Sequence, residues 1–228
     1  MLDGKTIKET GTSFDESHPY ANRDPRLKAT VMYTGNSYTL ADGTEVVINC
    51  EKGEGKDGYG VGSDCSATGY YIKKYWDNTY RATLYSGLNP ILIRYADILL
   101  MYAEAEVRKT GTVPSVAAIN AVNQVRKRAG LSDLPSVTTN TKDAFLNAIL
   151  IERGHEFFYE GNRKIDLIRF NKYAQEMYKA KGIMPTHQYM PIPNYAVEQA
   201  ISYGKELKQT WERPGWAEDK SKAQQSIN

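Results

Sequence analysis

The spacing of hydrophobic residues along this chain changes near residue 90. Before that point, apolar residues alternate over residues 27–33, which is typical of a strand. Residues 38–49 contain Asp42-Gly43 between strand-forming residues, the strongest short signal for a hairpin. Residues 69–76 indicate a further strand. The Gly-rich stretch 51–64 predicts a loop and not a nucleotide cradle, because no strand-then-helix context surrounds it.

Beyond residue 90 the spacing becomes helical. Residues 94–109 are apolar on most sides, a pattern typical of a helix packed between other elements. Gly111 ends this helix, and a second helix is predicted over residues 114–128. Because residues 110–113 form only a short connection, we expect the two helices to pack antiparallel, as in one tetratricopeptide unit.

Further helices are predicted in the rest of the chain. One begins after Asn140, with Asn140 and Asp143 as its cap, and runs to about Glu160 before Gly161 stops it. Three shorter helices follow, at residues 163–170, 173–179 and 194–201. Prolines make residues 189–193 extended.

The elements together predict a mainly α fold in one structural domain. Residues 1–92 form a region of loops and short strands, residues 93–216 carry the helices, and residues 217–228 are a polar tail that we expect to be disordered. A chain of 228 residues can bury a sizeable core.

Composition excludes several classes of function. Lys and Arg number 29 against 27 Asp and Glu, and no basic cluster is dense enough for binding nucleic acid. No apolar run is long enough to span a membrane, and the first residues predict no signal peptide. The three histidines, His18, His155 and His187, are far apart in sequence, so we predict neither a metal site nor a cofactor.

Tyrosine is the unusual component, with 17 tyrosines against 5 phenylalanines. Its flat apolar face and its hydroxyl suit ligand platforms, although many tyrosines simply pack at the ends of strands and helices. Five aromatic residues in the loop-rich region are the candidate ligand-binding residues: Tyr70, Tyr71, Tyr75, Trp76 and Tyr80.

Charged residues gather in the helical part. The group comprises Arg94, Asp97 and Glu104 on the first helix, and Glu152, Glu156, Glu160, Arg163, Asp166 and Arg169 farther on. Glu152, Glu156 and Glu160 share one helix face, and cations across them would remove their repulsion. Arg163 and Arg169 lie just past Gly161 and could fold back to supply those charges. A pair of carboxylates for acid–base catalysis is the alternative, but no histidine or nucleophile accompanies them. We therefore predict a structural ion network and no catalytic residue.

The two cysteines, Cys50 and Cys65, flank the Gly-rich loop. If the protein is exported, they could close this loop as a disulfide that contributes roughly 3 kcal/mol in the loop-entropy model. If the protein is cytosolic, they are free thiols.

Several segments resemble the SusD/RagB family, in the expected order along nearly the whole chain. They begin with Asp24-Pro25-Arg26-Leu27 and Ile93-Arg94-Tyr95-Ala96-Asp97-Ile98-Leu99-Leu100-Met101-Tyr102-Ala103-Glu104-Ala105. Next come Ile119-Asn120-Ala121-Val122-x-x-Val125-Arg126-x-Arg128-Ala129-Gly130-Leu131 and Ile151-Glu152-Arg153-x-x-Glu156-Phe157-x-x-Glu160-Gly161-x-Arg163-x-x-Asp166-Leu167-Ile168-Arg169. The last are Pro191-Ile192-Pro193 and Thr210-x-x-x-Pro214-Gly215-Trp216. Gly154, His155 and Lys164 depart from the family pattern.

The resemblance implies a tetratricopeptide-like α–α superhelical scaffold without catalytic activity. It also implies a surface-exposed lipoprotein of the outer membrane of Bacteroidetes-type bacteria, which binds a glycan and covers a SusC-like TonB-dependent transporter. Family members are longer and begin with a lipoprotein signal, so the resemblance marks this chain as a C-terminal portion, with its lipid anchor elsewhere. No family binding motif aligns with the five candidate aromatic residues.

Three functions remain as hypotheses from the sequence. The first is a glycan-binding component of a nutrient uptake system. The second is a scaffold that only contacts the transporter. The third is a glycoside hydrolase that uses Glu152 with Glu156 or Glu160, against which the resemblance and the missing partner residues both argue.

Overall fold

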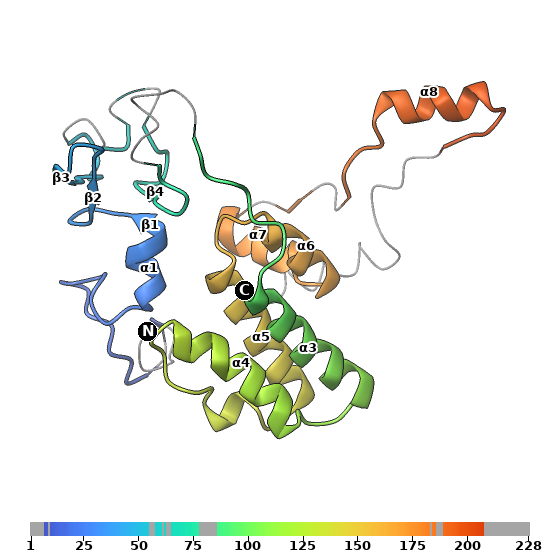
Figure 1. The fold of residues 1–228 in the computed structure, drawn as a ribbon, viewed down its shortest axis with the longest axis horizontal. Helices are drawn as coiled ribbons and strands as arrows, with labels where there is room; N and C mark the ends of the chain where they lie inside the picture. Colours follow the sequence, from blue (N-terminus) through green and yellow to red (C-terminus); the bar gives the residue numbers. More distant parts are fainter. Residues whose placement is uncertain are drawn as a thin grey trace. The chain divides into compact units, whose positions relative to one another are not determined.

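The computed structural model describes residues 7–8, 10–54, 58–60, 62, 65–77, 86–182, 184–185 and 189–207 (Figure 1). It is mainly α with a few short strands, which confirms the predicted fold class. The chain forms two compact units, Met1–Gly161 and Asn162–Asn228. The change in hydrophobic spacing near residue 92 therefore lies inside the first unit. The predicted tail at residues 217–228 lies outside the described residues.

The first unit begins with a helix where a strand was predicted. Residues 27–33 fall mostly in α1 (Pro25–Thr30), and only the short strand β1 (Val31–Met32) follows. The strand prediction was wrong because local capping outweighs the alternation of apolar residues. The Asp24 carboxylate accepts a hydrogen bond from the Arg26 backbone N–H at 3.0 Å, and Pro25 occupies the first turn.

Two small antiparallel sheets follow. Strand β2 (Ser37–Thr39) pairs with β3 (Glu45–Val47), and Gly43 supplies the positive φ of 85° in the turn, as the hairpin signal predicts. Strand β1 pairs with β4 (Tyr71–Ile72), so the strand predicted at residues 69–76 is confirmed over two residues. A small cluster of Met32, Ile48 and Cys50, with Tyr38 and Tyr71 packed against it, lies in this region.

Three helices form the rest of the first unit and contact one another (Figure 1). They are α3 (Tyr95–Thr110), α4 (Val116–Arg128) and α5 (Lys142–Glu156), with the short η1 (Ser136–Thr138) before α5. Figure 1 shows α4 running back along α3 after a short turn, as predicted. Gly111 ends α3 with φ 72°, a conformation that residues with a Cβ rarely adopt.

The ends of α5 differ from the sequence prediction. Its N-cap is Thr141, whose hydroxyl accepts a hydrogen bond from the Ala144 N–H at 3.1 Å, so Asn140 and Asp143 do not form the cap. A Thr side chain at this position satisfies an N–H that the helix leaves unpaired. The helix ends at Glu156 with Phe157 as its C-cap, one turn before the predicted end at Glu160.

The helix bundle holds most of the fully buried apolar side chains of the first unit. Six of them are Leu100, Val107, Val122, Val125, Phe145 and Ile149. Ala103, Ala118 and Ala121 are also buried, and such small side chains let helices approach closely. This core fixes the positions of the charged and aromatic residues at its edge.

The second unit contains the three short helices predicted from the sequence: α6 (Asn162–Arg169), α7 (Tyr173–Lys181) and α8 (Asn194–Ser202). Helices α6 and α7 contact each other, and Ala174 is buried with Tyr173 and Met184 packed around it. None of the helices in the described part of the chain has both the length and the apolar character needed to cross a bilayer.

Candidate functional site

The buried face of α5 carries Glu152 and Glu156, one helical turn apart, and Glu160 follows in the turn after the helix. In the described residues, the cations bound to these carboxylates come from five positions: Arg26, Lys74, Arg94, Arg126 and Arg128. Of the arginines proposed from the sequence to neutralise them, Arg169 pairs with Asp166 within α6 at 2.9 Å. Four of the five cations, Arg26, Arg94, Arg126 and Arg128, stand in the family-like motifs. Of these, the sequence analysis assigned only Arg94 to the network, and the motifs were the signal that could have revealed the other three.

Arg26 joins the N-terminal helix to α5. Its guanidinium donates to Glu152 at 2.7 Å, to Glu156 at 2.9 Å and to Asp24 at 2.6 Å. Burial opposes its charge, but the hydrogen bonds to Asp24 and the nearby charge of Glu152 outweigh burial and raise the pKa of Arg26. Arg126 donates to the second oxygen of Glu152 at 3.0 Å.

Glu156 accepts hydrogen bonds from three arginines. Arg94 and Arg26 each bind one of its oxygens, and Arg128 Nη2 reaches both, at 2.8 and 2.7 Å. Arg94 also binds Glu160, together with Lys74, and lies over the Phe157 ring at 4.5 Å from its centroid. Burial would raise the pKa of both carboxyls, yet hydrogen bonds from Arg94 and its neighbours lower it overall.

Two acidic residues of α3, Asp97 and Glu104, form separate ion pairs. Asp97 binds Arg153 of α5 at 2.6 Å, whereas Glu104 binds Arg108 of the same helix at 2.8 Å. A glycosidase needs one carboxylic acid with a raised pKa, but Glu156 and Glu160 both have lowered values. The ion pairs therefore suit the structural role predicted from the sequence and not acid–base catalysis.

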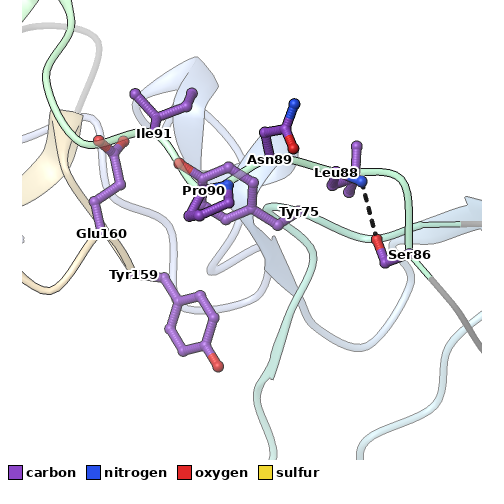
Figure 2. Close-up of a pocket in the computed structure, with 8 residues that line it drawn as sticks. All are labelled: Tyr75, Ser86, Leu88, Asn89, Pro90, Ile91, Tyr159 and Glu160. Carbon is purple, nitrogen blue, oxygen red and sulfur yellow. Dashed lines mark hydrogen bonds between the residues drawn. The ribbon is translucent and has the colours of Figure 1, made fainter.

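A cavity of about 360 Å³ lies beside this ion network (Figure 2). It is lined by Tyr75, Ser86, Leu88, Asn89, Pro90, Ile91, Tyr159 and Glu160. Tyr75 follows β4, and Tyr159 lies in the turn after α5, so two segments far apart in sequence each supply one tyrosine. Both rings are partly exposed, at 37% and 60%.

The backbone holds both tyrosines in an uncommon conformation. Tyr75 has φ 63° and Tyr159 has φ 61°, values that non-glycine residues rarely adopt and that cost roughly 1–3 kcal/mol each. The surrounding contacts hold this geometry. Lys73 and Lys74 before Tyr75 donate backbone hydrogen bonds to Thr30, and Glu160 after Tyr159 is fixed by Lys74 and Arg94.

Two polar groups of the cavity, Ser86 and Glu160, are held by hydrogen bonds. Ser86 Oγ accepts a hydrogen bond from the Leu88 N–H at 3.2 Å (Figure 2). The same hydroxyl donates to Asp77 at 2.7 Å. Burial and the charge of Glu160 raise the pKa of Tyr75, so its hydroxyl stays neutral at physiological pH. Two aromatic faces beside an amide, a hydroxyl and a carboxylate match a ligand with apolar C–H faces and several hydroxyls.

The five aromatic residues proposed from the sequence lie in different surroundings. Tyr75 lines the cavity, and the neighbouring Trp76 is 42% exposed with Tyr38 packed edge-on at 4.9 Å. Tyr70 is exposed and contacts Tyr20, their hydroxyls 3.4 Å apart. Tyr71 packs against the small cluster near Cys50, and its hydroxyl accepts from the Ser66 N–H. Tyr80 lies outside the described residues.

Sequence reasoning missed Tyr159, although it stands next to Glu160 in a recognised motif. The missing information was the pairing of this turn with the segment before α3, which is a tertiary contact. No disulfide joins Cys50 and Cys65 in the structure, and Cys50 is buried. Within the described part of the chain, no group of three potential metal ligands occurs.

Comparison with known proteins gives one consistent result. The model of the SusD family matches residues 1–215. A SusD-like protein of Formosa agariphila is 36% identical over 127 residues, which cover 50% of this chain and 25% of that protein. A solved SusD-like protein of Bacteroides fragilis is 30% identical with a TM-score of 0.57, over 68% of this chain and 29% of that one.

A second solved structure from Bacteroides fragilis, a SusD-like carbohydrate binding protein, has the same fold. It is 23% identical with a TM-score of 0.59, over 98% of this chain and 44% of that chain. The chain thus spans between 25% and 44% of the length of these three relatives.

Proposed function

The chain belongs to the SusD family, whose members are carbohydrate-binding proteins and not enzymes, and we propose that it binds a glycan as part of a nutrient uptake system. The cavity between Tyr75 and Tyr159 carries this proposal. Its two tyrosine faces offer stacking surfaces for sugar rings, and Asn89 and Ser86 offer hydrogen bonds for hydroxyls. Trp76, next to Tyr75, extends the aromatic surface as a second candidate stacking residue.

The setting of this function is also a proposal. We infer that the complete protein lies on the outer surface of the outer membrane, held by a lipid anchor, and covers a SusC-like TonB-dependent transporter. Family membership supports this setting. Capture of the transporter from outer membranes by the tagged protein, with and without glycan, is the direct test.

Loss of the Tyr75 ring should weaken glycan binding. A glycan array identifies the best ligand, and titration calorimetry then compares the Tyr75→Ala and Tyr159→Ala variants with the unaltered chain. We expect each variant to bind about tenfold more weakly, because a stacked aromatic pair contributes about 0.5–1.5 kcal/mol beyond the area it buries. The Trp76→Ala variant tests the neighbouring ring in the same way.

The matched control is Tyr102→Ala, because Tyr102 is a half-exposed tyrosine of α3 that lines none of the cavities described here. Its affinity should stay within about twofold of the unaltered chain. If Tyr75→Ala and Tyr159→Ala both bind as tightly as Tyr102→Ala while all three melt normally, the proposed site is wrong.

A second candidate function is a scaffold that contacts the transporter without binding glycan. The exposed apolar residues before and within α3, Leu92, Ile93 and Ile98, favour it because exposed apolar side chains grouped on one segment often mark a surface that contacts another protein. Transporter capture and the glycan array together distinguish the two functions. A scaffold alone would capture the transporter equally with and without glycan and would give no signal on the array.

A further inference from the structure

A second cavity, of about 380 Å³, opens between the beginning of α3 and the end of α4. It is lined by Arg94, Tyr95, Ala96, Leu99, Gln124, Val125 and Arg128. The aromatic cavity described above shares none of these residues. Tyr95, Gln124 and Arg128 are exposed, and all three line this cavity with polar or aromatic groups.

Arg128 is the charged group of this cavity, and its side chain is 61% exposed. Its Nη2 binds Glu156, whereas Nε and Nη1 make no hydrogen bond with any described residue. A guanidinium has five N–H donors in a planar fork that matches carboxylate and sulfate oxygens. Nη2 is therefore anchored, and the N–H groups of Nε and Nη1 remain available to a ligand.

The charge balance around Arg128 is positive. Glu156 is one carboxylate with three bound guanidiniums, those of Arg26, Arg94 and Arg128. A neighbouring cavity of about 280 Å³ is also lined by Arg94 and Arg128. The bonded ion network as a whole has five cations, Arg26, Lys74, Arg94, Arg126 and Arg128, against four carboxylates, Asp24, Glu152, Glu156 and Glu160. A fixed excess of positive charge at a partly enclosed surface attracts an anion.

The other groups of the cavity suit a sugar ring. Tyr95 is 70% exposed and offers an aromatic face, and Gln124, one turn before Arg128 on α4, offers an amide that both donates and accepts. Leu99 and Val125 close the space with apolar surface.

We propose that this cavity binds an acidic unit of the glycan, a uronate or a sulfated sugar, with its anion on Arg128 and its ring on Tyr95. The inference rests on the proposed function in taking the ligand to be a glycan. The 280 Å³ cavity shares Arg94 and Arg128 with this one and Tyr75, Ile91 and Glu160 with the aromatic cavity. The aromatic cavity and this cavity therefore lie close enough for one oligosaccharide to place a neutral unit in the first and an acidic unit in the second.

The test uses titration calorimetry of the whole chain with a galacturonate tetrasaccharide, its fully methyl-esterified form, and a sulfated galactan tetrasaccharide. The ester removes the charge and keeps the ring, so preferential binding of either charged probe supports the proposal, and the two charged probes distinguish carboxylate from sulfate. Binding of the preferred probe should weaken as sodium chloride rises, because salt screens exposed charges.

Three variants make the test specific. Arg128→Gln should bind the preferred charged probe about tenfold more weakly and the methyl ester unchanged, because a charge-assisted hydrogen bond is lost. Lys127→Gln, the same charge change at the next position of α4, is the matched control, since Lys127 is exposed and pairs with Asp133 outside the cavity. Tyr95→Ala should weaken the charged and esterified probes alike.

The proposal is overturned if neither charged probe binds more tightly than the ester, or if Arg128→Gln binds no more weakly than Lys127→Gln while both melt normally. These results leave the proposed function standing if Tyr75→Ala still lowers affinity for a neutral glycan. Conversely, loss of charged-probe binding in Arg128→Gln, with Tyr75→Ala and Tyr159→Ala without effect, supports the acidic site and overturns the aromatic one.

Discussion

At the scale of single residues, Glu156 is the centre of the first unit. It is nearly inaccessible to solvent, yet it accepts hydrogen bonds from Arg26, Arg94 and Arg128, which lie in or beside three different elements. Burying a carboxylate without such partners would cost several kcal/mol. The side chain therefore holds α1, the start of α3 and the end of α4 against α5.

Replacing this carboxylate should strongly destabilise the chain. In Glu156→Gln, three arginines lose their shared anion, among them the buried Arg26, and we expect the free energy of unfolding to fall by about 3–5 kcal/mol. Urea unfolding followed by circular dichroism measures the change. The matched control is Glu176→Gln, which removes an exposed pair with Lys179 and should cost less than about 1 kcal/mol. Equal losses in the two variants would contradict the central role of Glu156.

At the scale of elements, caps and turns decide where each helix begins. Asp24 with Pro25 starts α1 in a stretch whose apolar alternation indicates a strand, and Thr141 starts α5 one residue after the expected cap. Periodicity over a longer span was reliable, since α3, α4, α6, α7 and α8 lie within a few residues of their predicted ranges. Short stretches of six or seven residues fit a helix and a strand equally well, so a single cap decides between them.

The cap of α5 can be tested alone. Thr141→Ala removes the hydroxyl that accepts the Ala144 N–H, and we expect a loss of about 1 kcal/mol in the free energy of unfolding. Thr141→Ser keeps this hydroxyl and should retain most of the stability, whereas Asn140→Ala should change little because Asn140 is not the cap. A larger loss in Asn140→Ala than in Thr141→Ala would show that the helix begins at the earlier residue.

At the scale of the whole molecule, family membership and the ion network describe one scaffold with two neighbouring cavities. The motifs that resemble the family supply most members of the network: Arg26, Arg94, Arg126, Arg128, Glu152, Glu156 and Glu160. The aromatic cavity is built mainly from residues outside those motifs, such as Tyr75 and Asn89. The same scaffold can therefore carry different binding surfaces.

The pH dependence of unfolding reports on this network. Glu156 and Glu160 have pKa values below the ordinary 4.5, so the unfolded chain binds more protons at acidic pH. Their stabilising contribution is complete above about pH 5 and is lost as pH falls through 4.5 and then through the lower folded values. Urea unfolding between pH 3 and 7 measures this, and Glu156→Gln should show a shallower decline. An unchanged slope in that variant would contradict the assignment.

The sequence by itself determined the mainly α class, the order of the helices, the hairpin at Asp42-Gly43 and the family. These follow from local periodicity, turn residues and motifs, which act over neighbouring positions. Tertiary structure decided which cations bind the glutamates of α5, and it brought Tyr75 together with Tyr159. Residues 84 positions apart in the chain meet only because the helices pack around one core, and no local pattern records such a contact.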